Sequence, residues 1–288
     1  MGDILKIIGV FTALLLFTVL VATVLGTMFF GESGNVALIR LDGEIGSTSS
    51  ILSQTASSED LVNAIEDARD NPDIQAVIVA INSPGGTVVA TKEIANALKT
   101  VHKPKICWLR EVAASGAYWV ASACDKIVAD EFTLTGSIGV SGSYLEFSKL
   151  FEKYGISYVR LVSGENKDIG TPYREPTEAE KASLQAMIGE IRNAFVAEVA
   201  ANRNLSYEYV SNLSDGSVFT GGQALKFGLI DYVGDKQTVY NITKEMANLT
   251  EINTITYEKR LSLPELLAGF VGESLAKYIA QNNFKLIA

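Results

Sequence analysis

The chain has 288 residues, of which 48% are hydrophobic, and its 33 acidic and 24 basic side chains give a formal net charge of −9. That length fits one large domain or two small ones, and the acidic excess argues against nucleic acid as a partner, because phosphate binding needs clustered lysine and arginine. A single histidine, His102, and two cysteines, Cys107 and Cys124, argue against a Ser-His-Asp triad, a histidine-ligated metal centre and a disulfide-rich scaffold.

The first expected element is an uncharged apolar run at 7–30, which is long enough to cross a bilayer as a helix. The run exceeds the apolar region of a cleaved secretory signal, so we interpret residues 1–31 as an uncleaved membrane anchor. Ahead of it, the α-amine, Asp3 and Lys6 sum to one positive charge, which favours a cytoplasmic N-terminus. The sequence therefore predicts a single-pass protein of the cell membrane whose catalytic domain is extracytoplasmic.

Beyond the anchor, strand patterns alternate with helix patterns. In chain order we expect a strand at 36–41, a Gly/Ser/Thr-rich linker at 43–58, a helix at 61–69, a strand at 74–81, a helix at 88–101, a strand at 106–109, a turn at 111–115, a helix at 116–123, and strands at 126–129 and 156–162. Strands that alternate with helices at this spacing pair in parallel, so the predicted fold class is α/β. We interpret Cys107 and Cys124 as small buried apolar residues, and His102 as a surface residue in a polar turn.

Two further segments complete the chain. After Pro176, a long amphipathic stretch has a helical spacing of apolar residues that indicates core packing: Leu184, Met187, Ile188, Ile191 and Phe195. Residues 251–288 combine a strand-like run at 252–257 with a helical stretch from Pro264, and the sequence leaves open whether they pack on their own domain or line a substrate path. The predicted domains are a membrane anchor at 1–31, a strand and linker at 32–58, and one catalytic domain at 59–288.

Two turns rich in small residues follow two consecutive predicted strands, with the sequences Asn-Ser-Pro-Gly-Gly at 82–86 and Ala-Ser-Gly-Ala at 114–117. Adjacent parallel strands bring both turns to one edge of the sheet, where open α/β sheets bind ligands. The N–H groups of Gly86 and Gly116 can then point at one oxygen beside the Ser115 hydroxyl, a geometry that suits acyl transfer. The alternative is that the glycines only form turns and that Ser115 only caps a helix.

A serine nucleophile needs a base, and with the histidine discounted the alternatives are a lysine, a carboxylate or a metal. A lysine has the reach, but its ordinary pKa of about 10.4 keeps it charged unless burial lowers that pKa. Lys167 lies in a polar, glycine-containing stretch at 162–172, whose composition is that of a solvated loop. Glu165 and Asp168 flank it, and nearby carboxylates raise a lysine pKa, so their side chains must point elsewhere if Lys167 is a base.

Four segments together resemble the short form of the bacterial and archaeal signal peptide peptidases, a family of Ser-Lys serine peptidases with a fold similar to Clp protease and crotonase. They appear in the family's order, at 82–86, 114–118, 134–140 and 163–181. The resemblance extends from about Val36 to the C-terminus. It implies a Clp protease/crotonase-like arrangement of repeated strand-helix units with parallel sheets.

The resemblance also implies roles for five residues. Ser115 matches the nucleophile, Lys167 matches the general base, and Ser137 matches the serine that hydrogen-bonds the lysine amine. Gly86 and Gly116 match the donors of the oxyanion hole. No metal and no cofactor are required by this chemistry.

The resemblance further implies an assembly and a substrate class. In the short-form family, the serine and lysine of one working site are thought to come from neighbouring protomers of a ring, so we expect a homo-oligomer, with eight protomers for a chain of this form. The implied substrates are cleaved signal peptides and other unfolded apolar peptides. The lipid bilayer is a partner through the N-terminal helix.

Other interpretations stay open at this point. A crotonase-like acyl-CoA hydratase or thioesterase would use the paired N–H donors with acidic catalysts in place of a Ser-Lys pair. A non-catalytic membrane scaffold would use Ser115 only as a helix cap. A membrane protease of the stomatin-associated type would have the same chemistry and different substrates.

Overall fold

The computed structural model of the chain describes residues 14–15, 18, 34–48 and 55–257. Apart from residues 14, 15 and 18, the predicted anchor at 7–30 lies outside this part, as does the predicted helix from Pro264. Among the helices that fall within the described ranges, none is long and apolar enough to span a bilayer. The anchor and its orientation therefore stay predictions.

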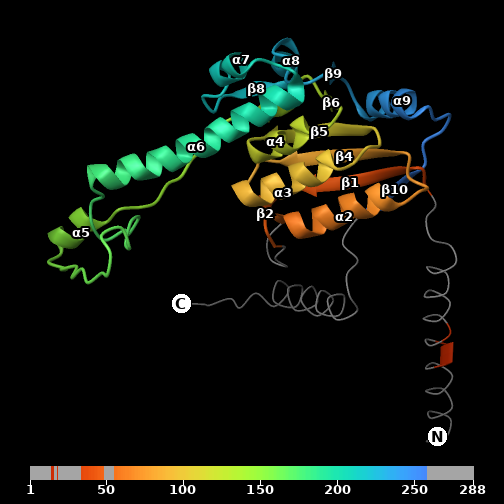
Figure 1. The fold of residues 1–288 in the computed structure, drawn as a ribbon. Coiled ribbons are helices and arrows are strands. Elements are labelled where there is room, and N and C mark those ends of the chain that lie inside the picture. The colour runs from red at the N-terminus through yellow and green to blue at the C-terminus, as the bar shows by residue number, and fades with distance from the viewer. Residues whose placement is uncertain (1–13, 16–17, 19–33, 49–54, 258–288) are drawn as a thin grey trace, which may run out of the picture.

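A sheet of eight strands forms the centre of the described part (Figure 1). The strands of its main path lie in the order β10 (Thr254–Tyr257), β1 (Val36–Asp42), β4 (Ala76–Ser83), β5 (Lys105–Ala114), β6 (Lys126–Ala129) and β9 (Tyr232–Val233). Every pair along this path is parallel, which confirms the predicted α/β class. Off this path, β7 (Leu134–Gly136) pairs in parallel with the end of β5 and antiparallel with β8 (Val218–Thr220).

Helices cover both faces of this sheet (Figure 1). On one face lie α2 (Ser58–Asp70), α3 (Val88–Lys99) and α4 (Gly116–Ser122), and on the other lies α9 (Lys236–Ala247). Alternate residues of one strand pack into different layers: Val77 and Val79 belong to the cluster with α2–α4, and Ala76 and Ile78 belong to the cluster with α9. A strand that is buried on both faces explains the nearly unbroken apolar run at 74–81.

The helix α6 (Glu178–Arg203) joins the sheet layers to a projecting segment (Figure 1). Its C-terminal half packs against α4 and α7 (Tyr207–Asn212) and buries Phe195, while α8 (Gly221–Lys226) follows further along the chain. Its N-terminal half runs away from the sheet together with α5 (Ser148–Lys153). We call residues 144–187 the arm.

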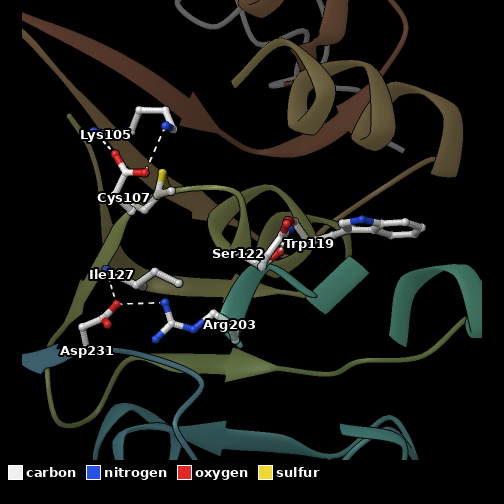
Figure 2. The surroundings of a disulfide bond; sticks show 10 residues. Lys105, Cys107, Trp119, Ser122, Ile127, Arg203 and Asp231 are labelled. Carbon is white, nitrogen blue, oxygen red and sulfur yellow. Dashed lines mark hydrogen bonds and ion pairs between the residues drawn. A yellow bond between two sulfur atoms is a disulfide. The ribbon is translucent and has the colours of Figure 1, made fainter. Parts of the chain in front are cut away.

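The two cysteines form a disulfide with a Cα–Cα distance of 5.8 Å (Figure 2). Both are buried as predicted, but their interpretation as unpaired apolar residues is wrong, because α4 returns the chain to β5 and brings Cys124 beside Cys107. Next to them, Lys105 donates from its backbone N–H and from Nζ to the Asp125 carboxylate, at 2.8 and 3.1 Å. Closing a loop of 17 residues stabilises the fold by about 3 kcal/mol in the chain-entropy model.

Three expected elements differ from the structure. The linker at 43–58 contains β2 (Glu44–Gly46) and β3 (Thr55–Ser57), which pair with each other in parallel. The expected turn at 111–115 is strand up to Ala114, because β7 pairs with this end of β5. The expected strand at 156–162 has no strand partner in the described chain, and its side chains are exposed.

The expected burial of the long helix is also wrong for its first half. Of the five apolar residues at helical spacing, only Phe195 is buried, and Met187 is 54% exposed. The amphipathic pattern is real, but the N-terminal half of α6 belongs to the arm and has no sheet beneath it (Figure 1). At the other end of the chain, β10 pairs with β1, so residues 254–257 pack on their own sheet.

Candidate active site

Ser115 lies where β5 ends and α4 begins, in a backbone conformation that is rare for a residue with a side chain. Its φ is 54° and its ψ is −127°, and its side chain makes no capping hydrogen bond to α4. A positive φ outside glycine costs about 1 to 3 kcal/mol and persists only where the surroundings hold it. Here the Ser115 N–H donates to the Gly136 carbonyl at 2.9 Å, and the Ser115 carbonyl accepts from Trp119 N–H at 3.0 Å. Ser115 is therefore fixed at a sharp strand-to-helix turn without acting as a side-chain cap.

The glycine turn after β4 lies against Ser115 because β4 and β5 are neighbours, with Ser83 paired to Ala113. Gly85 has a φ of +106°, and a Cβ on it would lie 2.8 Å from Gly116 N and 2.9 Å from Ser115 Cβ. The Ile45 N–H of β2 donates to the Gly85 carbonyl at 2.8 Å, and Thr87 N–H donates to the Ile45 carbonyl at 2.9 Å. Only glycine fits at this distance between two backbones.

Gly86 and Gly116 present two backbone N–H groups side by side. A Cβ on Gly116 would lie 3.4 Å from Gly86 N, and a Cβ on Gly86 would overlap the backbone of Ile45. Within the described residues, neither N–H has a hydrogen-bond acceptor, and the amide of a first helical residue has none inside its own helix. Two adjacent free N–H groups beside a serine hydroxyl can stabilise an oxyanion.

Ser137 reaches the same place through β7. The register pairs Ala114 with Gly136, so Ser115 and Ser137 are the residues that follow two paired strand ends. Ser137 also has a positive φ, of 49°, and its N–H donates to the Ser217 carbonyl at 2.8 Å. This placement depends on β7, which the sequence analysis did not contain as a strand.

A cavity of about 590 Å³ joins these residues. Ser115, Ser137, Gly86 and Gly116 all line it. Further walls come mainly from α3, α4 and α6. The large apolar side chains in the walls are Val88, Trp119, Val140, Ile188 and Phe195. The cavity therefore combines a hydroxyl and two N–H donors with apolar walls, as ligand pockets do.

Trp119 and Phe195 form an aromatic wall of the cavity that the sequence analysis missed. Their rings stack with centroids 4.3 Å apart and an interplanar angle of 5°. Phe195 was expected only as core, and Trp119 gave no signal except its position one helical turn after Ser115. The stack fixes the distance between α4 and α6 beside the serine.

Glu198 was also not expected from the sequence. It stabilises the aromatic wall from outside the cavity. Its carboxylate accepts from Lys92 at 2.9 Å, from Lys99 at 2.6 Å and from the Trp119 indole N–H at 3.1 Å. Burial by itself raises the pKa of Glu198, but the hydrogen bonds from Lys99, Lys92 and Trp119 together lower that pKa to about 2. No sequence pattern could find this cluster, because its members come from three helices.

Lys167 does not lie with the other four candidate residues. It does not line the cavity, its side chain is exposed, and its turn belongs to the arm between α5 and α6. Its backbone N–H donates to the Gly164 carbonyl at 3.1 Å. One chain thus gathers Ser115, Ser137, Gly86 and Gly116 at the ends of β4, β5 and β7, and leaves Lys167 on a projecting segment.

His102 is exposed, as expected for a surface role. In the part of the chain that the structure describes, no group of three or more His, Cys, Asp or Glu side chains could hold a metal ion.

Two family models match this chain: "Peptidase family S49" over residues 97–250, which is more than half of the chain, and "Clp protease" over residues 44–129. A protein of Methanocaldococcus jannaschii, provisionally named protease MJ0651, is 34% identical over 198 residues, which cover 68% of this chain and 64% of that protein. A protein of Enterococcus faecium, provisionally named signal peptide peptidase SppA, is 31% identical over 226 residues, which cover 77% of this chain and 64% of that protein. The chain thus matches just under two thirds of the length of each of these relatives.

A solved structure has a similar fold. It is a mutant of the 1510-N membrane-bound stomatin-specific protease, with a TM-score of 0.53 and 15% identity. The match covers 78% of this chain and 98% of the other. At this identity the likeness concerns the fold alone.

Proposed function

The chain belongs to peptidase family S49, and we propose from this that it is a membrane-anchored serine endopeptidase that uses Ser115 as nucleophile and Lys167 as general base. The observation that carries the proposal is the position of Ser115, which is held at a positive φ beside the N–H groups of Gly86 and Gly116 in one cavity. This arrangement of a half-buried hydroxyl in a cavity and two convergent N–H donors is the one that acyl transfer needs.

The proposed reaction passes through an acyl-enzyme. The Ser115 oxygen attacks the peptide carbonyl carbon while the neutral Lys167 amine takes the hydroxyl proton. The N–H groups of Gly86 and Gly116 bind the oxygen of the tetrahedral intermediate, and Lys167 returns the proton to the leaving amine as the C–N bond breaks. A water molecule, deprotonated by the same amine, then attacks the ester carbon. As the bond from that carbon to the Ser115 oxygen breaks, the Lys167 ammonium returns the proton to this oxygen, which regenerates the hydroxyl and the neutral amine. Ser137, next to Ser115, hydrogen-bonds the lysine amine and orients it.

The base comes from a neighbouring subunit in this proposal. Lys167 lies on the arm and outside the cavity of its own chain, which supports a site completed by a second copy. The arm carries large apolar side chains that are strongly exposed, among them Leu145 (72%), Val159 (75%) and Leu161 (89%). An apolar surface of this kind on a projecting segment is typical of a contact between chains. We place the arm of each subunit against the cavity of the next in a closed ring, with eight members as the family resemblance implies.

The proposed substrates are cleaved signal peptides and other unfolded apolar peptides. The stacked Trp119 and Phe195 rings, with Val88 and Ile188, give the cavity apolar walls that fit such side chains. The provisional name of the Enterococcus faecium relative, signal peptide peptidase, supports this class.

The disulfide supports an extracytoplasmic place for the catalytic domain. Disulfides such as Cys107–Cys124 form and persist mainly in oxidising compartments. Together with the predicted anchor at 7–30 and its cytoplasmic N-terminus, this supports a single-pass protein of the cell membrane with residues 34–257 outside the cytoplasm.

Labelling with a fluorophosphonate probe, which reacts with activated serines, tests the proposal on the full chain in detergent. We expect one labelled residue, Ser115, and at least a 100-fold loss of labelling rate at pH 7 in Ser115→Ala and in Lys167→Ala. His102→Ala is the matched control, because it removes an exposed side chain of the histidine type usual in triads and should label as wild type. Labelling of Lys167→Ala at the wild-type rate would show that Lys167 is not the base that activates Ser115.

A further inference from the structure

The turn that carries Lys167 is held by an ion-pair network on the arm. The Asp168 carboxylate, next to Lys167 in sequence, accepts four hydrogen bonds. Two come from Arg160 Nε and Nη2 at 2.9 and 2.8 Å, and two come from Arg174 Nε and Nη2, both at 3.0 Å. Only 11% of the Asp168 side chain is exposed. These hydrogen bonds, first from Arg160 and then from Arg174, hold the pKa of Asp168 well below its usual range.

The same network ties the turn to the first turn of α6. Arg174 also donates to both oxygens of the Glu180 carboxylate, at 2.8 and 2.5 Å. Glu180 in turn accepts from Thr177 N–H at 2.8 Å and so closes the capping box of the helix. The hydrogen bonds from Arg174 and Thr177 lower the pKa of Glu180 to about 2. We call Arg160, Asp168, Arg174 and Glu180 the arginine clamp.

The clamp leaves Lys167 without an acidic partner among the described residues, although several carboxylates surround it in sequence. Glu175 pairs with Lys149 at 3.1 Å, and Glu178 pairs with Lys181 at 2.7 Å. Glu165 contributes its backbone carbonyl to Arg160 Nη2, at 2.5 Å. A carboxylate released towards Lys167 would stabilise the charged amine and oppose its use as a base.

We propose that Arg160 and Arg174 are positioning residues for the base: they hold the Asp168 carboxylate away from the Lys167 amine and fix the turn that presents this amine to the neighbouring subunit. The inference rests on the proposed function, because it assigns these residues a role only if Lys167 is the base. It accounts for a requirement that the sequence alone left unmet, namely that an aspartate adjacent to the base must point elsewhere. Bidentate arginine binding gives a fixed direction to a carboxylate, which a lysine in the same place would not.

The test is the pH dependence of fluorophosphonate labelling in full-length Arg174→Gln. Without Arg174, the Asp168 carboxylate keeps only the two hydrogen bonds from Arg160, so its negative charge is less compensated and favours the protonated amine. The acid limb of the labelling rate should therefore move up by about 1 pH unit, with the rate at high pH retained. Adding Asp168→Asn to this variant removes the carboxylate and should return the limb to its wild-type position. Lys153→Gln is the matched control, because it removes another exposed lysine from the arm without taking an ion-pair partner from any carboxylate among the described residues, and it should leave the limb unchanged.

Arg160→Gln is a second variant, in which the Arg174–Glu180 pair and the start of α6 are kept, and it should shift the limb in the same direction. If both arginine variants lost labelling rate equally at every pH, with the acid limb in its wild-type position, the inference would be overturned. The arginine clamp would then have only a structural role. A failure of the proposed function would give a different result, because Lys167→Ala itself would then label with the wild-type rate and pH profile.

Discussion

At the scale of single residues, the backbone of Ser115 is the feature that sets this site apart from an ordinary strand-to-helix turn. The conformation at φ 54° and ψ −127° is the mirror image of an extended one, which glycine adopts readily and serine does not. The chain has a serine at this position, although glycine would adopt the conformation at a lower free energy. The strain is understandable if the hydroxyl must project beside the N–H groups of Gly86 and Gly116.

Replacing Ser115 by two different inactive residues separates strain from chemistry. We expect Ser115→Gly and Ser115→Ala both to lose labelling and hydrolysis, because both lack the hydroxyl. Ser115→Gly should be more stable than Ser115→Ala by about 1 kcal/mol, since only glycine relieves the positive φ. Denaturant unfolding of the two variants measures this difference. Equal stability would mean that the turn holds no backbone strain.

The placement of Gly86 and Gly116 beside Ser115 was predictable from sequence, because it depends only on two neighbouring parallel strands, β4 and β5. The close approach of Ile45 to the glycine turn was not predictable, because β2 lies in a segment whose composition resembles a linker. Ser137 needed a resemblance to a known family, since β7 is only three residues long and has no strong pattern of its own.

At the scale of elements, the contacts between α3, α4 and α6 decide the shape of the cavity. Glu198 of α6 receives hydrogen bonds from Lys92 and Lys99 of α3 and from Trp119 of α4. The Lys92 ammonium also lies 5.6 Å from the centre of the Trp119 ring. One carboxylate therefore joins three helices behind the stacked wall.

This carboxylate predicts how stability depends on pH. The pKa of Glu198 is lowered to about 2 in the folded chain, so its contribution is fully present above the ordinary glutamate value near 4.5 and is lost as the pH falls towards 2. Glu198→Gln should reduce the free energy of unfolding by about 1 to 2 kcal/mol at pH 7 and flatten the loss of stability between pH 4.5 and 2.

Urea unfolding at a series of pH values measures this effect, with Glu190→Gln as control, because Glu190 is exposed on the same helix. An acid dependence as steep in Glu198→Gln as in wild type would show that the lysines and the indole do not act through Glu198.

The arm was not predictable at this scale. An amphipathic helix indicates that one face is covered, but not whether its own sheet or another chain covers it. Leu184, Met187 and Ile188 have the spacing of core residues, yet only the second half of α6 meets α4. The prediction of a strand at 156–162 was wrong for the same reason. The segment has no partner strand within the described residues, and its apolar side chains are exposed. The disulfide escaped prediction because pairing of Cys107 with Cys124 depends on how α4 turns back to β5.

At the scale of the whole molecule, one subunit divides the proposed catalytic groups between two places. The sheet edge holds Ser115 with the N–H groups of Gly86 and Gly116, and the arm holds Lys167 on the turn that the arginine clamp organises. Under the proposed function, a lone subunit is inactive and hydrolysis starts only on assembly.

Mixing two inactive variants tests this central claim most directly. Ser115→Ala keeps Lys167, and Lys167→Ala keeps Ser115, so each pure ring lacks one group at every site. In rings formed by co-expression of equal amounts, about a quarter of the sites pair an intact serine with an intact lysine of the neighbour, if one chain supplies each group. We predict labelling and peptide hydrolysis at about a quarter of the wild-type level, with mixed assembly verified by co-purification of two different tags. Mixed rings with no activity above either parent would contradict the account and place the base within the same chain as the serine.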